Sequence, residues 1–230
     1  MTRSTVDPPA SETTKPRRPK LGKLGKALDP EFRRLQREYL SESSAARADL
    51  ARLRRGLGKP AGSVPDIWEL TVGKVPEELA WTGKEPSRAE QAAHAAMTLY
   101  ALHQQSLTVP IHKPGERFGA AVRRLSKGDK TSEEAVIRRF MAVATAQSIE
   151  EVLFHVRGLI TQLRREKHAL DYAMFADDIL NLLTPGRADQ VRLAWGREFY
   201  RTATGDGAAA TDNDTPDATS TPDRDNDDNE

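Results

Sequence analysis

Pairs of adjacent arginines recur along this sequence, and their chemistry stands out from that of the other side chains. Each guanidinium is planar and donates two hydrogen bonds to one oxyanion, which suits phosphate or carboxylate groups. Between residues 29 and 204 the pairs are Arg33-Arg34, Arg54-Arg55, Arg123-Arg124, Arg138-Arg139 and Arg164-Arg165. A nucleic-acid backbone bound in this way would be held without regard to sequence, and salt would weaken the binding.

The segment 116–127 carries the most informative cluster. At about 100° per residue, a helix over this segment separates apolar side chains from cations. The apolar side chains are Phe118, Ala121, Val122 and Leu125, and the cations are Arg117, Arg123, Arg124 and Lys127. A solvated helix usually interleaves acids one turn away, and none follows Glu116 in this segment. The pattern therefore predicts a face that binds a polyanion.

Three further groups complete the predicted nucleic-acid contacts. They are Arg54 and Arg55, then Arg138 and Arg139 on a helix after Ser132, and Arg157 and Arg164 on one edge of a helix after Ser148. Glutamates at 133, 134, 150 and 151 weaken the indication, because arginines on solvated helices are commonly paired with acids. Few aromatic residues look available for base stacking, and Trp68, Trp195, Phe199 and Tyr200 are interpreted as core residues. Composition alone favours a nucleic-acid-binding module and a protein-interaction module equally.

Nothing in the sequence indicates catalysis. Cysteine is absent, and so are a glycine-rich phosphate loop, a Gly-x-Ser-x-Gly elbow and a His-Glu-x-x-His motif. Glu90 and His94 lie one helical turn apart and would offer two ligands to the metal of a hydrolase, but metal sites usually need three or four. A capping glutamate and a packed histidine are the favoured interpretation. We expect no catalytic residue, no metal and no cofactor.

Charge divides the chain into three parts. Residues 1–28 hold seven Lys or Arg and two acids (net +5), residues 29–204 hold 27 and 23 (net +4), and residues 205–230 hold one and nine (net −8), which sum to +1. The two ends have little to bury, so we expect a disordered basic tail, one domain and a disordered acidic tail. With no apolar stretch of membrane length and no secretory signal, we expect a cytoplasmic protein without a membrane partner.

Helix signals fill the region between the tails, and no segment alternates as a strand would. We expect an all-α fold, a compact bundle of about seven to nine helices around a central buried helix. The central helix is 91–107, which has no formally charged residue, while the stripe of apolar residues over 149–163 predicts a surface helix. Asp29-Pro30 predicts the start of the first helix. Capping-box spacing occurs at Ser87/Glu90, Thr131/Glu134 and Ser148/Glu151.

Six segments stand in the order found in a known family. They are LYALHQQS (99–106), FGAAVRRL (118–125), EEAVIRRFMAVATAQSIEEV (133–152), VRGLITQLRRE (156–166), LDYAMFADDI (170–179) and GRADQVRLAWGREFYR (186–201). Together they resemble the CasB family, the small subunit of the type I-E CRISPR Cascade complex. No single motif is diagnostic, and the resemblance spans about residues 30–203.

This resemblance implies an all-helical, non-catalytic subunit present in two copies in the complex. Its partners would be the other Cascade subunits with their crRNA, a second copy of itself, and the displaced non-target DNA strand, whose binding stabilises the R-loop. The family's basic contacts correspond here to Arg123/Arg124, Arg138/Arg139 and Arg157, while Ala120 stands where some relatives have a basic residue. The alternative function is a purely structural adaptor whose arginines meet acidic protein surfaces.

Overall fold

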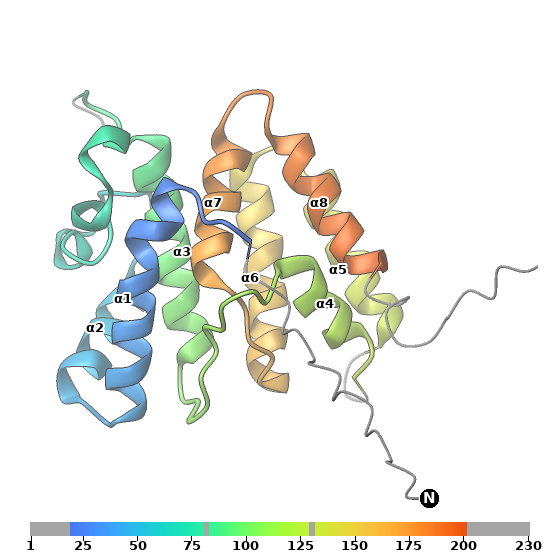
Figure 1. Cartoon of the computed structure of the whole chain (residues 1–230), viewed down its shortest axis with the longest axis horizontal. Coiled ribbons are helices and arrows are strands. Elements are labelled where there is room, and N and C mark those ends of the chain that lie inside the picture. The colour runs from blue at the N-terminus through green and yellow to red at the C-terminus, as the bar shows by residue number, and fades with distance from the viewer. Residues whose placement is uncertain (1–18, 81–82, 129–131, 202–230) are drawn as a thin grey trace, which may run out of the picture.

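The computed structural model describes residues 19–80, 83–128 and 132–201, which form an assembly of helices (Figure 1). The α-helices are α1 (Lys23–Leu40), α2 (Ser44–Arg55), α3 (Arg88–Gln104), α4 (Phe118–Ser126), α5 (Glu133–Thr145), α6 (Ile149–Glu166), α7 (Tyr172–Leu183) and α8 (Ala188–Arg201). Between α2 and α3 lie three 3₁₀ turns, η1 (Pro65–Ile67), η2 (Val72–Lys74) and η3 (Glu77–Leu79). The described residues contain no strand, only an isolated bridge between His112 and Leu170. The predicted all-α fold class is confirmed.

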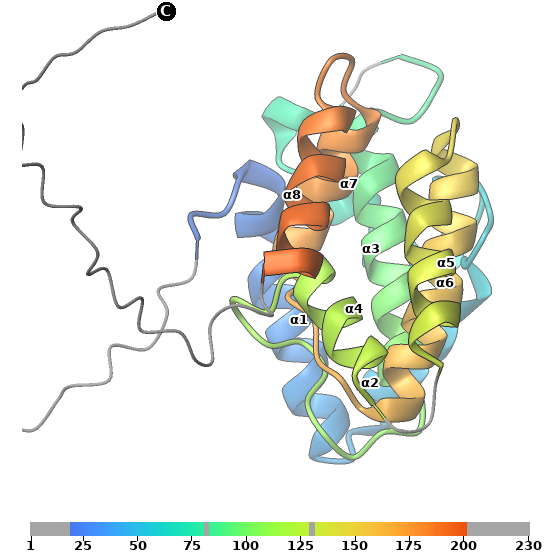
Figure 2. The same cartoon turned by 90° about the vertical axis from the view of Figure 1, so that its right-hand side faces the viewer.

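Helix α3 is the central helix, as the sequence predicts. It packs against α1, α2, α6 and α7, and Figure 2 shows it farther from the viewer than α4, α5 and α8. Every residue from Ala92 to Ala101 is buried. Tyr100 packs its ring against Phe32 of α1 and Tyr172 of α7, with ring centroids 5.2 and 5.3 Å apart. This aromatic cluster joins the three helices at the core.

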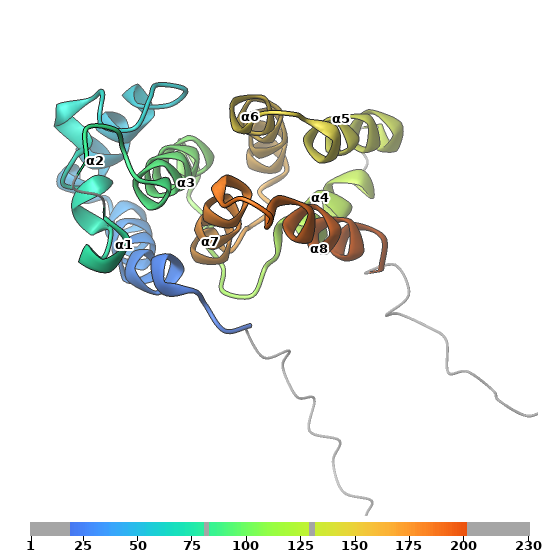
Figure 3. The same ribbon diagram turned by 90° about the horizontal axis from the view of Figure 1, so that it is seen from above.

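Helices α4, α5 and α8 lie on the far side of α6 and α7 from α3. Figure 3 shows α6 beside α5, with α7 and α8 on the other side, and α4 packs against both α5 and α8. The buried stripe of α6 consists of Val152, Val156, Leu159, Ile160 and Leu163, which confirms the predicted surface helix. The opposite side of α6 is therefore available to a partner. None of the described helices is long and apolar enough to cross a membrane.

Two of the three predicted capping boxes can be compared with the structure. At α3, Ser87 Oγ accepts the Glu90 N–H at 3.0 Å and the Glu90 carboxylate accepts the Ser87 N–H at 2.5 Å, so this box is confirmed. At α6, Ser148 Oγ accepts the Glu151 N–H at 3.1 Å, but the Glu151 carboxylate turns to the N–H of Gln147. Only half of that box forms. The third falls partly outside the described residues.

The start of the first helix differs from its prediction. Helix α1 begins at Lys23 and passes through Pro30, so a start at Asp29-Pro30 is wrong. The reason lies in packing, because Leu24 and Leu28 are fully buried in the core. Residues 19–28 therefore belong to the described fold and not to the predicted tail. The rest of that tail and the acidic tail 205–230 lie outside the described residues.

A carboxylate from a distant helix caps α1. Asp177 of α7 accepts the N–H of Gly22 at 2.7 Å and the N–H of Gly25 at 2.8 Å. Free N–H groups at a helix start need such acceptors, and a negative charge is favourable there. A Cβ atom on Gly25 would lie 2.5 Å from the Ala173 carbonyl oxygen and closer still to Asp177 Oδ2. The absence of a side chain at Gly25 thus allows α1 and α7 to approach each other.

Asp178, next to this cap, makes the stability of the fold depend on pH. Burial raises the pKa of Asp178 to about 7; Glu198 and Asp177 also raise it, while the Trp195 N–H and Arg117 lower it. The Trp195 Nε1–H donates to Asp178 Oδ2 at 2.8 Å. Since the unfolded-state pKa is near 3.8, the unfolded chain loses its proton first. This contribution therefore destabilises the fold progressively as the pH rises from about 4 to about 7.

We expect Asp178→Asn to remove this pH dependence, because asparagine still accepts the Trp195 N–H and does not ionise. Its free energy of unfolding should exceed that of the parent by about 1–3 kcal/mol at pH 8, and the difference should vanish near pH 4. Urea unfolding at a series of pH values measures this difference. The matched control is Asp189→Asn, a change of the same charge at an exposed site, which should have a smaller effect at pH 8 than Asp178→Asn. A difference that is constant for Asp178→Asn would contradict the assignment.

Candidate nucleic-acid interface

The cations on the predicted polyanion-binding face of α4 are paired with acids. Arg123 and Lys127 share the Glu133 carboxylate at the start of α5, at 3.1 and 2.9 Å. The side chain of Arg123 is only 18% exposed, and its guanidinium lies 5.7 Å from the centre of the Phe199 ring of α8. Arg123 therefore connects α4 to its two neighbouring helices.

The other two cations of this face also have acidic partners. Arg117 donates to the carboxylate of Glu198 on α8, and Arg124 pairs with Glu116 just before α4. Burial acts to raise the pKa of Glu116, but Lys113 and Arg124 outweigh it and hold that pKa below its usual value. Glu116 is thus a stable anion beside Arg124.

The expectation that no acid relieves the α4 face is wrong. Its partners come from the preceding loop, α5 and α8, so spacing along the helix does not show them. Three carboxylates, Glu116, Glu133 and Glu198, offset most of the positive charge of these four cations and so weaken the field that would attract a polyanion. Binding of nucleic acid by Arg117, Arg123, Arg124 and Lys127 stays a prediction.

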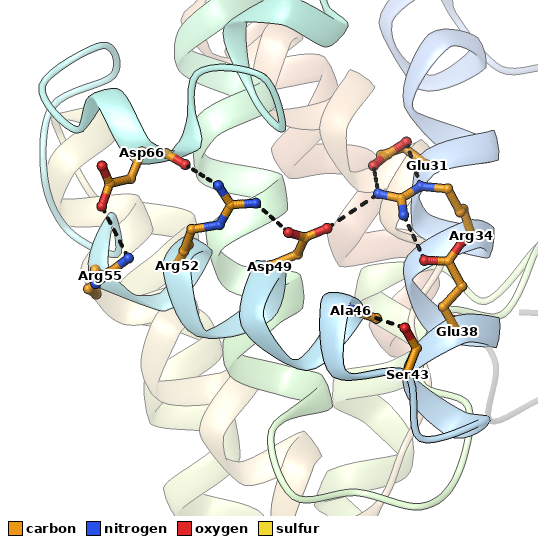
Figure 4. Close-up of polar contacts among 9 residues, drawn as sticks. All are labelled: Glu31, Arg34, Glu38, Ser43, Ala46, Asp49, Arg52, Arg55 and Asp66. Carbon is orange, nitrogen blue, oxygen red and sulfur yellow. Dashed lines mark hydrogen bonds and ion pairs between the residues drawn. The ribbon is translucent and has the colours of Figure 1, made fainter.

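A chain of ion pairs also connects α1, α2 and η1, as Figure 4 shows. The pairs are Arg34 with Glu31, Glu38 and Asp49, Arg52 with Asp49, and Arg55 with Asp66. Of the two predicted contacts on α2, Arg55 is paired at 3.1 Å, although both side chains are more than half exposed. Arg54 takes no part in this network.

Four predicted arginines come together from α2, α5 and α6. We call them the arginine face: Arg54, Arg139, Arg157 and Arg164. Gly58 lies immediately beyond α2. A Cβ atom placed on Gly58 would be 3.8 Å from Nη1 of Arg157, so this α6 side chain reaches the end of α2. A Cβ atom placed on Gly158 of α6 would be 3.8 Å from both Cδ and Nε of Arg139, so this α5 side chain lies against α6. Arg164 lies two turns beyond Arg157 on the same edge of α6.

The arginine face has no acidic partner within the described residues, in contrast to the α4 face. Arg164 donates instead to the neutral Gln105 Oε1 at 3.2 Å. Burial lowers the pKa of Arg54, and the nearby Arg164 lowers it further, while Tyr39 opposes both. Arg54 and Arg164, on different helices, are therefore near enough to repel each other, and neither has an acidic partner within the described residues. A phosphate group would relieve this repulsion.

Arg138 lies outside this face. Its side chain is 74% exposed, and the Glu134 carboxylate is 4.0 Å away on the same helix. Adjacent residues on a helix point about 100° apart, so Arg138 and Arg139 do not share a direction. The two arginines of an adjacent pair therefore point in different directions. In each of three pairs, on α2, α5 and α6, one member belongs to the arginine face, namely Arg54, Arg139 and Arg164.

Aromatic side chains are arranged differently from the prediction. Trp195 and Phe199 are buried, which confirms their interpretation as core residues, but Trp68 and Tyr200 are 49% and 57% exposed, so theirs is wrong. Phe154 of α6 is 73% exposed and was not anticipated. Its position off the buried stripe of α6 is the signal in the sequence that would have found it.

Glu90 and His94, which the sequence offers as two adjacent metal ligands, both make structural hydrogen bonds. Glu90 completes the capping box of α3, and His94 Nε2 lies 2.9 Å from the Gly56 carbonyl oxygen. A carbonyl oxygen accepts, so Nε2 carries the proton. Burial lowers the pKa of His94 and keeps the ring neutral. Both side chains hold helix ends together, as the favoured interpretation expects.

A second group, Asp29, His112 and Asp171, has the spacing of a metal site but is explained by hydrogen bonds. His112 Nδ1 accepts the Tyr172 N–H at 3.1 Å, so its proton is on Nε2, which lies 3.3 Å from Asp29 Oδ1. Asp171 caps α7 by accepting the N–H groups of Ala173 and Met174. Neither histidine nitrogen has a free lone pair for a metal.

Comparison with known proteins places the chain in a family. Residues 49–200 match the family described as CRISPR-associated protein Cse2. The structure of CasB from Thermobifida fusca is 35% identical and covers 78% of this chain and 99% of its own, with a TM-score of 0.64. No curated protein matches the chain.

Two further solved structures are similar. A Cse2-family protein from Thermus thermophilus is 25% identical over 77% of this chain and 97% of its own, with a TM-score of 0.56. A chain of a CRISPR RNA-guided surveillance complex is 18% identical over 78% of this chain and 94% of its own, with a TM-score of 0.61, which shows a shared fold. The family match and the similarity to CasB agree with the resemblance seen in the sequence, and the chain belongs to the Cse2 family of CRISPR-associated proteins.

Proposed function

We propose that this chain is a non-catalytic subunit of a type I-E Cascade complex and binds the backbone of the displaced non-target DNA strand. Membership of the Cse2 family and the fold shared with a chain of an RNA-guided surveillance complex support its place in such an assembly. The observation that carries the DNA-binding part is the arginine face, where Arg139, Arg157 and Arg164 lack acidic partners within the described residues.

The proposed role is to stabilise the R-loop. Base pairing with the guide RNA reads the target sequence, and the strand exchange is nearly balanced in free energy, so modest contacts to a backbone decide its direction. Arginine suits this role, because its fork binds a phosphate oxygen whatever the base. No base-reading residue is required.

The remaining partners follow from the same assignment. The chain would contact the repeating backbone subunits around the crRNA and a second copy of itself, in the cytoplasm. The ion-paired cations of α4 suit contacts with protein, since nearby carboxylates offset part of their charge. The alternative, a purely structural adaptor, keeps these protein contacts and lacks the DNA contact.

A single introduced cysteine tests the DNA contact, because the parent chain has none. Thr161 is exposed on α6 between Arg157 and Arg164, and its hydroxyl donates only to the Arg157 carbonyl. We expect Thr161→Cys carrying an aryl-azide crosslinker to attach to the displaced strand in a reconstituted R-loop complex. The matched control is Leu193→Cys on α8, 53% exposed, which should give no DNA adduct. Normal assembly without any adduct at Thr161→Cys would favour the adaptor.

A further inference from the structure

A groove lies next to the arginine face. It has a volume of about 660 Å³ and is bounded by the segment after α2, by α3, by the first half of α6 and by α7. Its walls include Leu57, Leu153 and Ile179. The volume falls within the range of roughly 300–1,000 Å³ typical of small-ligand sites. A planar, largely apolar group would therefore fit this space.

Phe154 stands at this groove with most of its ring in solvent. It is 73% exposed, and its ring lies edge-on to His155 at 5.3 Å, so one ring face is not covered by that contact. A single exposed apolar residue is ordinary by itself. Here the ring lines a groove together with Arg157, which follows one helical turn later. An aromatic ring beside unpaired cations is the arrangement that binds single-stranded nucleic acid.

Cations and acids lie at different positions along the groove. Lys59 and Arg157 lie at the groove and have no acidic partner within the described residues, and Arg157 continues into Arg164 along α6. Two acids also line it, Glu85 and Glu150. Glu150 lies one turn before Phe154, on the side away from Arg157. A polyanion that runs along α6 from Arg164 to Arg157 would thus reach Phe154 before it reaches Glu150.

We propose that Phe154 is a base-stacking site for one unpaired base of a single-stranded segment whose adjacent phosphates contact Arg157 and Lys59. Bases within a duplex are already stacked on each other, so only an unpaired strand can supply this group. The proposal rests on the proposed function and adds to it a contact that depends on a base instead of on charge. It also accounts for an exposed phenylalanine on an otherwise charged edge of α6.

The test compares Phe154→Ala with Phe154→Trp in the assembled complex, using target DNA with 2-aminopurine in the displaced strand. Phe154→Ala should weaken binding of the strand by about 5- to 150-fold, since one base–aromatic stack is lost. Stacking should quench 2-aminopurine in the parent and in Phe154→Trp but not in Phe154→Ala. The salt dependence of binding should be unchanged, because no charge is altered. A displaced strand with abasic sites should bind parent and Phe154→Ala equally.

Three results would overturn the stacking site, and they separate it from the proposed function. If Phe154→Ala binds as the parent does while reversal of Arg139 and Arg157 weakens binding, only the stacking site is wrong. If neither change has an effect, the DNA-binding function fails as well. If Phe154→Ala releases a protein subunit and leaves DNA affinity per complex unchanged, the groove binds a protein.

Discussion

Replacing Arg139 and Arg157 by glutamate should weaken binding of target DNA by the assembled complex about 100-fold or more at physiological salt, because two charged hydrogen bonds to phosphate are lost and repulsion is added. The fold should be unaffected. Both side chains are exposed and have no acidic partner within the described residues, so reversal breaks no ion pair there. A gel-shift or anisotropy titration with a reconstituted complex measures the effect.

A control with the same change in net charge makes this result specific. Arg37 of α1 and Arg197 of α8 are exposed and likewise lack an acidic partner within the described residues. Reversal of both should change DNA affinity less than about threefold, since unbound surface charges are screened over roughly 10 Å of solution. Equal weakening by the two double variants would show a general charge effect and contradict a located DNA site.

Replacing Gly25 by alanine should lower the free energy of unfolding by about 2–5 kcal/mol, which combines overpacking with the loss of a helix cap. The new methyl group would meet the Ala173 carbonyl oxygen at 2.5 Å and would press on Asp177 Oδ2 as well. Backbone cannot rotate away as a side chain can, so α1 would have to move from α7. Asp177 would then release the N–H groups that it caps. Thermal or urea unfolding of the full chain measures the change.

Gly196 of α8 supplies the matched control. It is also a helical glycine, and a Cβ atom placed there would meet no atom within 4 Å apart from its chain neighbours and the nearby backbone of α8. Gly196→Ala should therefore stabilise the protein by up to about 1 kcal/mol, as expected from helix propensity. If Gly25→Ala were as stable as the parent, the close contact of α1 with α7 described above would be incorrect.

Local patterns predict most of this fold. The uncharged stretch within α3, the stripe of α6 and the capping box at Ser87 depend on neighbours within a few residues, and each is confirmed. The start of α1 depends on Asp177, which lies 152 positions beyond Gly25 in the chain, and no local pattern shows that contact. A proline therefore indicated a helix start at a position that tertiary packing places inside α1.

The candidate site was predictable in kind but not in position. Arginine pairs are visible in the sequence, but whether an acid from another helix neutralises them is not. Glu133 and Glu198 reach the α4 face from α5 and α8, so every cation of the cluster that looks strongest in the sequence has an acidic partner. Arg139 and Arg157 lie on helices whose first turns contain two glutamates each, but neither arginine has an acidic partner within the described residues.

The central claim is that the arginine face holds phosphates of the displaced strand, and the salt dependence of binding tests it most directly. For a single strand, the slope of log K against log salt is about −0.7 for each phosphate contacted. Neutralising Arg139 and Arg157 with alanine should therefore make the slope shallower by roughly 1.4, while alanine at Arg37 and Arg197 should leave it unchanged. Equal slopes for the parent and the Arg139/Arg157 variant would contradict the claim.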